Sequence, residues 1–301
     1  MKREIKSFLA YVGVERGLSP KTVEAYRHDL GKFAEFAEKE LGSGYVIGDV
    51  DQYIIKAYMQ FLADEGYQKV NSPVSRGRKL ATLKSFFKYL EESRKVKSNP
   101  TSLVKMPKVP KKEPSYLTEQ EYKRLLRAVK NNATKFFRQR DSAIVMMLLG
   151  MGLRLSELTE LNIGDVNFED GAVKVKRKGN HERILPANDG VMISIKRYLK
   201  TRNTTKVEEP LFLSKRNQRI GNGSVWHLVK KYLQQARIEK EKLSPHTLRH
   251  TFATTLLRQG ENLLTIKELL SHRNLRTTER YLHIDDKELK SAVNRINLSS
   301  H

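Results

Sequence analysis

A proline-rich stretch one third of the way along the chain sets the strongest limit on its fold. Residues 99–115 hold four prolines interleaved with lysines, at positions 100, 107, 110 and 114. Repeated proline prevents a continuous helix and favours an extended chain. The 301 residues are enough for two hydrophobic cores. We therefore predict a linker at 99–115 between domains at 1–98 and 116–285, with a separate terminal segment at 286–301.

The first 98 residues show the periodicity of a small helical bundle. Near the N-terminus, apolar residues recur at helical spacing, at Ile5, Phe8, Leu9 and Val12. Ser19-Pro20 and Ser72-Pro73 each place a capping serine before a proline, which is typical of a helix start. Glycines interrupt the pattern between the predicted helices. Four helices packed as a compact bundle are the predicted fold of this domain.

The second domain is predicted to be mainly helical with one small β-hairpin. The capping box that starts at Thr118 opens a helix, and the apolar run Asp141–Met151 predicts a buried one. Ala172–Lys176 alternates as a strand, and Glu182–Leu185 is its expected partner across a turn at Gly179-Asn180. Further helices are expected at about 189–202, 224–237 and 286–296.

Charge and composition favour a polyanionic partner. Lysine and arginine total 57 against 34 acidic residues, so the formal net charge is +23. Such an excess is typical of nucleic-acid binding. The chain has no cysteine, which excludes disulfides and thiolate chemistry and fits a cytoplasmic protein. No apolar run is long enough to cross a membrane, and the first residues lack the apolar core of a signal peptide.

Reactive side chains are concentrated between residues 243 and 283. A helix predicted to begin at Ser244-Pro245 carries His246, Arg249 and His250 at positions i, i+3 and i+4 of one face. After a second apolar helix come His272 and, nine residues later, Tyr281. Guanidinium and imidazolium groups bind the non-bridging oxygens of a phosphodiester, and a phenol oxygen can attack its phosphorus. The pattern therefore favours phosphate chemistry.

The order and spacing of these residues resemble those of tyrosine recombinases, also called phage integrases, and most closely their Xer-like branch. The family pattern includes an upstream arginine in a Gly-Leu-Arg-x-Ser-Glu-Leu segment, and Arg154 stands in such a segment here. It also includes a lysine on a β-hairpin, where this chain has Lys178. The resemblance covers essentially the whole chain and implies a helical core-binding domain followed by a catalytic domain.

Two boxes depart from the family pattern. The hairpin reads Arg177-Lys178-Gly179 where Gly-Lys-Gly is usual, which leaves Lys176 as a second candidate for the catalytic lysine. His272 lies between a serine and an arginine where Gly-His-Ser is usual. Because serine is small, we expect the turn before His272 to survive.

The resemblance implies that Tyr281 attacks the DNA phosphorus and forms a 3′-phosphotyrosyl link. A phenol has an ordinary pKa of about 10, and nearby arginine and histidine charge favours its ionised form. Arg154, Arg249 and His272 would hold the phosphoryl oxygens as negative charge develops on them.

The remaining residues of the set would move protons or support the others. His246 would assist proton transfer at Tyr281, and Lys178 would protonate the departing 5′-hydroxyl. Glu157, three residues after Arg154, is well placed to orient its guanidinium, and His250 would support the helix of Arg249. The sequence has no Walker loop, no dinucleotide fingerprint and no evident carboxylate cluster for two metals, so we expect no cofactor and no metal.

The resemblance also implies the partners. We expect binding to double-stranded DNA at a two-armed recombination site, as a homotetramer or with a partner recombinase, and no contact with a membrane. The amphipathic segment 286–301 would dock onto a neighbouring protomer, although docking on its own domain gives the same pattern. Phosphate contacts from the first domain and the linker are expected from Arg76, Arg78, Lys79, Lys84, Lys105 and Lys108. A solvated surface is the competing interpretation for these basic residues.

Two other functions fit part of the sequence. A non-catalytic DNA-binding regulator would share the charge and the helices, but binding alone does not require the intact catalytic set. A type IB topoisomerase acting as a monomer would share the chemistry, but the separate helical domain and the terminal helix favour the recombinase.

Overall fold

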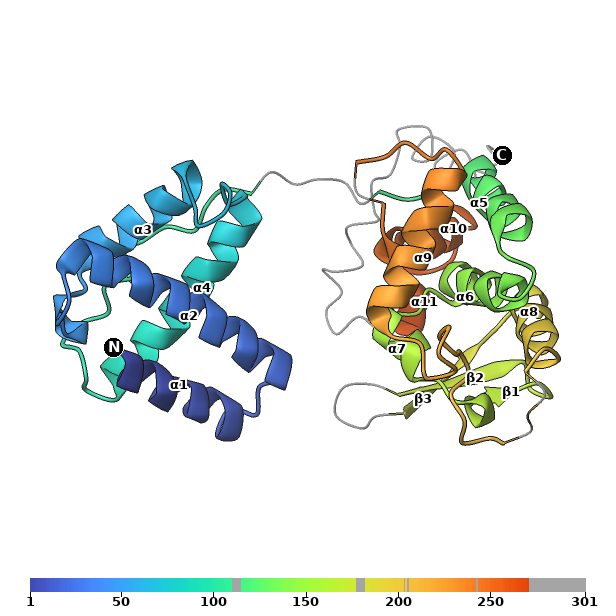
Figure 1. Ribbon diagram of the computed structural model, residues 1–301, viewed down its shortest axis with the longest axis horizontal. Helices are drawn as coiled ribbons and strands as arrows, with labels where there is room; N and C mark the ends of the chain where they lie inside the picture. Colours follow the sequence, from blue (N-terminus) through green and yellow to red (C-terminus); the bar gives the residue numbers. More distant parts are fainter. Residues whose placement is uncertain (110–114, 177–181, 203, 205, 242, 271–301) are drawn as a thin grey trace, which may run out of the picture. The chain divides into compact units, whose positions relative to one another are not determined.

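The chain divides into two compact units, Met1–Lys111 and Lys112–His301, each with its own hydrophobic core (Figure 1). The computed structural model describes residues 1–109, 115–176, 182–202, 204, 206–241 and 243–270. Among these residues, no helix combines the length and the apolar character that a membrane crossing needs. The division between the units falls within the segment predicted as a linker.

The N-terminal unit is a helical bundle around an aromatic core. Its helices are α1 (Lys2–Val14), α2 (Pro20–Leu41), α3 (Gln52–Asp64) and α4 (Pro73–Glu92), with a short 3-10 turn, η1 (Ile47–Asp49), before α3. The predicted helix starts are confirmed, since the side chains of Ser19 and Ser72 accept hydrogen bonds from backbone N–H groups of α2 and α4. The core contains a chain of edge-to-face ring contacts through Phe8, Phe86, Phe87 and Phe33.

The first part of the proline-rich segment packs on this unit. Thr101 and Val104 are buried, and a Cβ added at Gly77 of α4 would lie 3.6 Å from the Met106 side chain. Contacts of Val104 and Met106 therefore hold the first part of the predicted linker on the helical bundle.

The second unit is built around one buried helix. The helices are α5 (Glu119–Asn132), α6 (Arg138–Met151), α7 (Leu155–Glu160), α8 (Asp189–Leu199), α9 (Asn222–Gln235), α10 (Pro245–Arg258) and α11 (Leu263–Leu270), with a 3-10 turn η2 (Ile163–Asp165). Successive residues Ala143, Ile144 and Val145 of α6 are all buried, so this helix is covered on more than one side. It packs against α5, α8 and α10.

A three-stranded antiparallel sheet lies below these helices in Figure 1, in the order β1-β2-β3. The strands are β1 (Val166–Asn167), β2 (Ala172–Lys176) and β3 (Glu182–Pro186). The predicted hairpin is confirmed, with Ala172 opposite Pro186 and Lys176 opposite Glu182. The sequence did not predict β1, because two residues are too short to show alternation. In the described residues β3 is an edge strand, paired with β2 alone.

Candidate active site

A left-handed glycine sets the path of the chain into the site. Gly152 ends α6 with φ of 60°. A Cβ at this position would lie 2.5 Å from the Phe252 ring and 3.0 Å from the Leu270 side chain, so glycine is required both by conformation and by space. Leu153 then turns into the core, and Arg154 follows as the N-cap of α7.

Glu157 holds Arg154 by two hydrogen bonds. Its Oε1 accepts from Nη1 of Arg154 at 2.7 Å, and its Oε2 accepts from the backbone N–H of Arg154, also at 2.7 Å. The carboxylate is buried, whereas the Arg154 side chain remains 38% exposed. The three-residue spacing seen in the sequence thus places an acidic anchor behind a guanidinium that still reaches the surface.

Arg249 joins the same carboxylate from α10. Its guanidinium is buried and donates hydrogen bonds to the backbone carbonyls of Gly152 and Leu270. Its Nη1 also lies 3.9 Å from Oε2 of Glu157. Two arginines from segments about a hundred residues apart therefore meet at one buried glutamate, and Arg249 also ties α10 to the end of α11.

Helix α10 presents the two histidines near its start. His246 is exposed, one turn before Arg249, and His250 is partly buried. Ser244 occupies the N-cap position as predicted, and its backbone N–H donates to Oγ1 of Thr247 at 3.1 Å.

Lys178, His272, Tyr281 and the terminal segment 286–301 lie outside the described residues. The structure places the ends of the segments that lead to them. Lys176, the second candidate lysine, is exposed at the end of β2. Leu270, the last residue of α11, is buried against α10 through Ala253.

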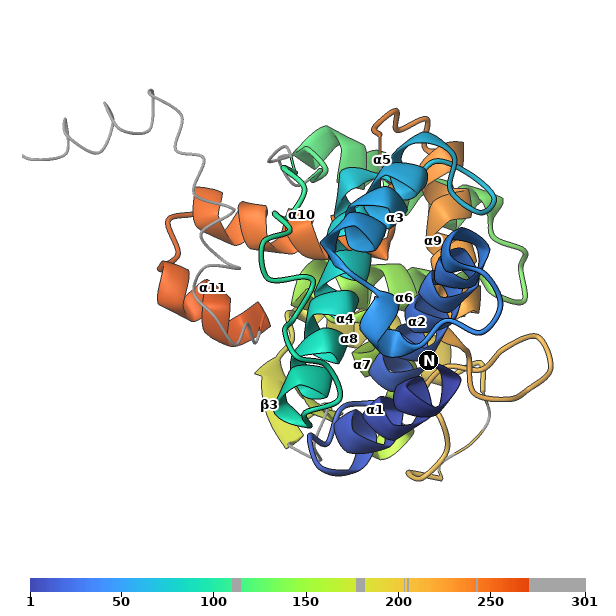
Figure 2. The same cartoon turned by 90° about the vertical axis from the view of Figure 1, so that its left-hand side faces the viewer.

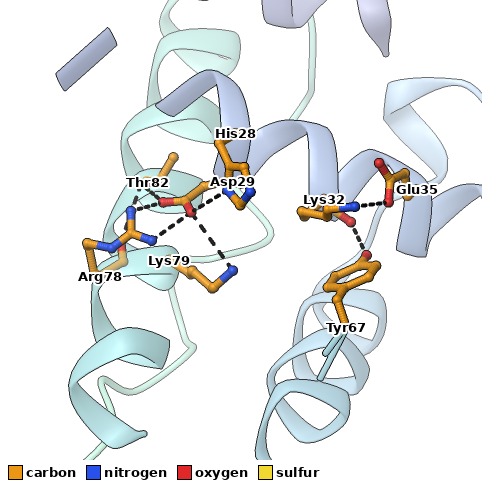
Figure 3. A network of polar contacts seen from close by, with 8 residues as sticks. All are labelled: His28, Asp29, Lys32, Glu35, Tyr67, Arg78, Lys79 and Thr82. Carbon is orange, nitrogen blue, oxygen red and sulfur yellow. Dashed lines mark hydrogen bonds and ion pairs between the residues drawn. The ribbon is translucent and has the colours of Figure 1, made fainter. Parts of the chain in front are cut away.

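In the N-terminal unit, a buried carboxylate holds two of the predicted DNA contacts (Figure 3). Asp29 of α2 is 2% exposed and accepts hydrogen bonds from both Nη atoms of Arg78 on α4, with Nη2 at 2.8 Å from Oδ1. The hydroxyl of Thr82 donates to Asp29 at 3.1 Å, and the Lys79 amine lies 3.9 Å away. The sequence analysis missed Asp29, although its spacing from Phe33 puts it on the apolar face of α2.

The basic residues of this unit have unequal environments. Lys79 is buried, and burial lowers the pKa of its amine while the nearby Asp29 carboxylate acts in the opposite direction. The Arg78 side chain is 52% exposed despite its contact with Asp29. Arg76 and Lys84 are partly buried, and Lys105 and Lys108 are exposed. DNA contact by these residues stays a prediction.

A hollow of about 720 Å³ lies between α6, the segment 214–221 and α9, apart from the arginine pair. Arg140, Asp141 and Tyr232 form a network on its wall. Asp141 accepts a hydrogen bond from Arg140 Nε at 2.9 Å and another from the Tyr232 hydroxyl at 2.7 Å. Burial, together with the bond to Asp141, raises the pKa of Tyr232. This phenol therefore stays protonated at neutral pH and is a poor nucleophile.

The structure has the helical N-terminal unit and the second unit expected for a tyrosine recombinase. Arg154 lies at the start of α7, and Arg249 lies on α10 with the two histidines. Comparison with known proteins shows the same class. Residues 115–288 match the phage integrase family, and residues 5–94 match the N-terminal SAM-like domain of phage integrases. The chain belongs to the phage integrase family and is a tyrosine-type site-specific recombinase, an enzyme that cleaves and rejoins DNA.

The relatives place the chain in the Xer-like branch. Tyrosine recombinase XerC from Caldanaerobacter subterraneus subsp. tengcongensis is 38% identical over 315 residues, covering 98% of this chain and 87% of the relative. Tyrosine recombinase XerD from Proteus mirabilis is 34% identical over 290 residues, covering 95% and 90%. A crystal structure of the XerH site-specific recombinase bound to palindromic difH DNA has a TM-score of 0.75 at 21% identity, covering 93% of this chain and 81% of that one. This likeness concerns the fold.

Proposed function

We propose that Tyr281 is the nucleophile of a strand transfer that passes through a 3′-phosphotyrosyl intermediate. The Oη–phosphorus bond forms as the bond from phosphorus to the 5′-oxygen breaks. His246 assists removal of the phenolic proton, and Lys178 gives a proton to the departing 5′-oxygen. Attack by a DNA 5′-hydroxyl reverses the step, so the phosphodiester energy is conserved and no nucleotide is consumed.

The meeting of Arg154 and Arg249 at Glu157 carries this proposal. An attacked phosphodiester gains negative charge on its non-bridging oxygens, and guanidinium groups fixed in advance stabilise that charge without reorganising. Glu157 is within 2.7 Å of Arg154 and 3.9 Å of Arg249. We propose that both arginines bind the phosphate there, and that His272 adds a further hydrogen bond.

For the whole protein, we propose binding of a two-armed DNA site as a tetramer or with a partner recombinase. The two XerC and XerD relatives support this assignment, as does the XerH complex with a DNA site. The exposed Lys105 and Lys108 and the surface of α4 would contact phosphates from the N-terminal side. A role in chromosome segregation in the cytoplasm is consistent with the Xer-like relatives.

A suicide DNA substrate tests the covalent step. The wild-type protein is expected to form an adduct that survives SDS, without added metal or nucleotide. Tyr281→Phe removes only the attacking oxygen, so this variant should bind the same site with unchanged affinity and form no adduct. An adduct of equal yield from Tyr281→Phe would disprove the nucleophile. Site binding by a wild type that forms no adduct would favour a non-catalytic DNA-binding protein.

A further inference from the structure

Arg183, which is not one of the residues predicted for the site, joins the β2–β3 hairpin to helix α11. It lies on β3, opposite Val175 and one pair away from Lys176–Glu182, the last described pair of the hairpin. Its Nη1 donates a hydrogen bond to the backbone carbonyl of Glu268, and its Nη2 lies 3.5 Å from the Glu268 carboxylate. A strand and a helix separated by about eighty residues are thus bound by one side chain. The ribbons of β3 and α11 lie near each other in Figure 2.

The contact falls in the last described turn of α11. The last four carbonyl oxygens of a helix have no N–H donor within the helix, and arginine side chains can donate to them. In α11 the carbonyl of Glu268 accepts from Arg183, and the carbonyl of Leu270 accepts from Arg249. Two arginines from different elements therefore bind carbonyls in the last described turn of α11.

The two elements do not depend on Arg183 equally. Helix α11 is also held by Arg249 and by the buried side chains of Ile266 and Leu270. Strand β3 has pairing on one edge within the described residues, and only Leu185 of its five residues is buried, while Ile184 is 70% exposed. The half of β3 nearest the hairpin turn thus has little apolar packing, so the contact with α11 matters more to the strand.

We propose that Arg183 is a positioning residue for the general acid: by tying β3 to the end of α11, it fixes the hairpin that carries Lys178. This inference rests on the proposed role of Lys178 and extends it. Displacing a catalytic group by about 1 Å can cost on the order of 10²-fold in rate. The effect of Arg183 is confined to the step in which the 5′-oxygen leaves, because that is the step Lys178 serves.

Single-turnover cleavage of two DNA substrates tests the proposal. The first is the natural phosphodiester, and the second has sulfur in place of the 5′-bridging oxygen and leaves without a proton. On the natural substrate, Lys178→Ala should be slower by about 10²-fold or more, the range for a lost general acid, and Arg183→Ala by about 10-fold. On the sulfur substrate, both variants should cleave within about twofold of the wild type.

Matched variants separate positioning from loss of charge or of fold. Arg197→Ala removes an exposed positive charge from α8 of the same unit and should leave both rates unchanged. Glu268→Gln keeps the backbone carbonyl that Arg183 binds, so it should stay near the wild-type rate. Arg183→Gln provides a second test of the position if the alanine variant unfolds, and the fluorescence of the single Trp226 reports whether this unit is folded.

The double variant completes the test. If Arg183 acts through Lys178, adding Arg183→Ala to Lys178→Ala should slow cleavage no further. Two results would overturn the positioning role alone. In the first, a folded Arg183→Ala variant stays slow on the sulfur substrate. In the second, the double variant is slower than Lys178→Ala by the same factor that separates Arg183→Ala from the wild type. If the sulfur substrate rescues neither Lys178→Ala nor Lys176→Ala, the general acid is not on this hairpin, and the positioning role of Arg183 fails as well. If the sulfur substrate rescues Lys176→Ala and not Lys178→Ala, Lys176 is the general acid, and Arg183 remains its positioning residue.

Discussion

At the scale of single residues, the two arginines of the candidate site differ in what else they hold. Arg154 is partly exposed and bonded to Glu157, whereas Arg249 is buried and supports the carbonyls of Gly152 and Leu270. Without Arg249, the carbonyls of Gly152 and Leu270 lose the donor that they have in the wild type. A buried carbonyl that loses its donor costs about 1–3 kcal/mol. Both arginines are proposed to bind the phosphate, but only Arg249 is expected to stabilise the fold through the backbone as well.

We expect Arg154→Ala and Arg249→Ala each to slow cleavage by about 10²-fold or more, since each removes a charged donor to the phosphate. Only Arg249→Ala should also lower the melting temperature, by several degrees. Rates on a suicide substrate and thermal unfolding followed by Trp226 fluorescence measure the two effects. Equal melting temperatures for the two variants would show that the bonds from Arg249 to the backbone add little stability.

Residues that act through a distant partner were beyond the reach of the sequence. Arg154 and Arg249 stand in recognisable boxes, and Glu157 is close enough to Arg154 in the chain to be noticed. Asp29 and Arg183 acquire their roles from Arg78 and Glu268, which lie 49 and 85 residues further along. The spacing of Asp29 from Phe33 indicates that Asp29 is buried, but neither it nor Arg183 shows in the sequence which residue it binds.

At the scale of elements, short sequence signals predicted the helices and strands whose formation depends on neighbouring residues in the chain. The Ser-Pro pairs predicted the starts of α2 and α4, alternation predicted β2, and the turn between them predicted β3 as its partner. Strand β1 was missed because its pairing with β2, rather than its own two residues, makes it a strand. The packing of residues 101–107 on α4 was missed for a similar reason, since prolines and lysines indicate an extended chain without showing what it lies against.

The pairing of α2 with α4 yields a prediction at this scale. Asp29→Ala leaves Arg78 and Lys79 without their acid, and a hydrogen bond to a charged group contributes about 1.5–3 kcal/mol. We expect the N-terminal unit to unfold at lower urea, seen by far-UV circular dichroism, while the Trp226 transition of the second unit stays in place. Glu24→Ala is the control, because its pair with Arg27 is largely exposed and should contribute no measurable stability. A variant of Asp29 as stable as the wild type would show that the α2–α4 contact is held by apolar packing alone.

At the scale of the whole molecule, the fold class and the order of the two domains followed from the sequence. The assembly on DNA did not, because docking in cis and docking in trans leave the same apolar stripe. We propose that residues 286–301 dock on a neighbouring protomer, so their deletion should leave binding to a single half-site unchanged and abolish synapsis of two sites. Gel-shift titration and analytical ultracentrifugation on DNA measure these outcomes. A truncated protein that unfolds, or that still forms normal synapses, contradicts docking in trans.

Gly152 has a consequence for how this enzyme can vary over evolution. The space that a side chain would need at that position is filled by Phe252 from α10 and by Leu270 from α11. A single added methyl group would push against both helices, and so against the two elements that meet at Arg249. The substitutions allowed at this position are therefore restricted by the space around it as strictly as those at the arginines are restricted by charge. A lineage could keep every ionisable group of the site and still lose activity through one carbon atom.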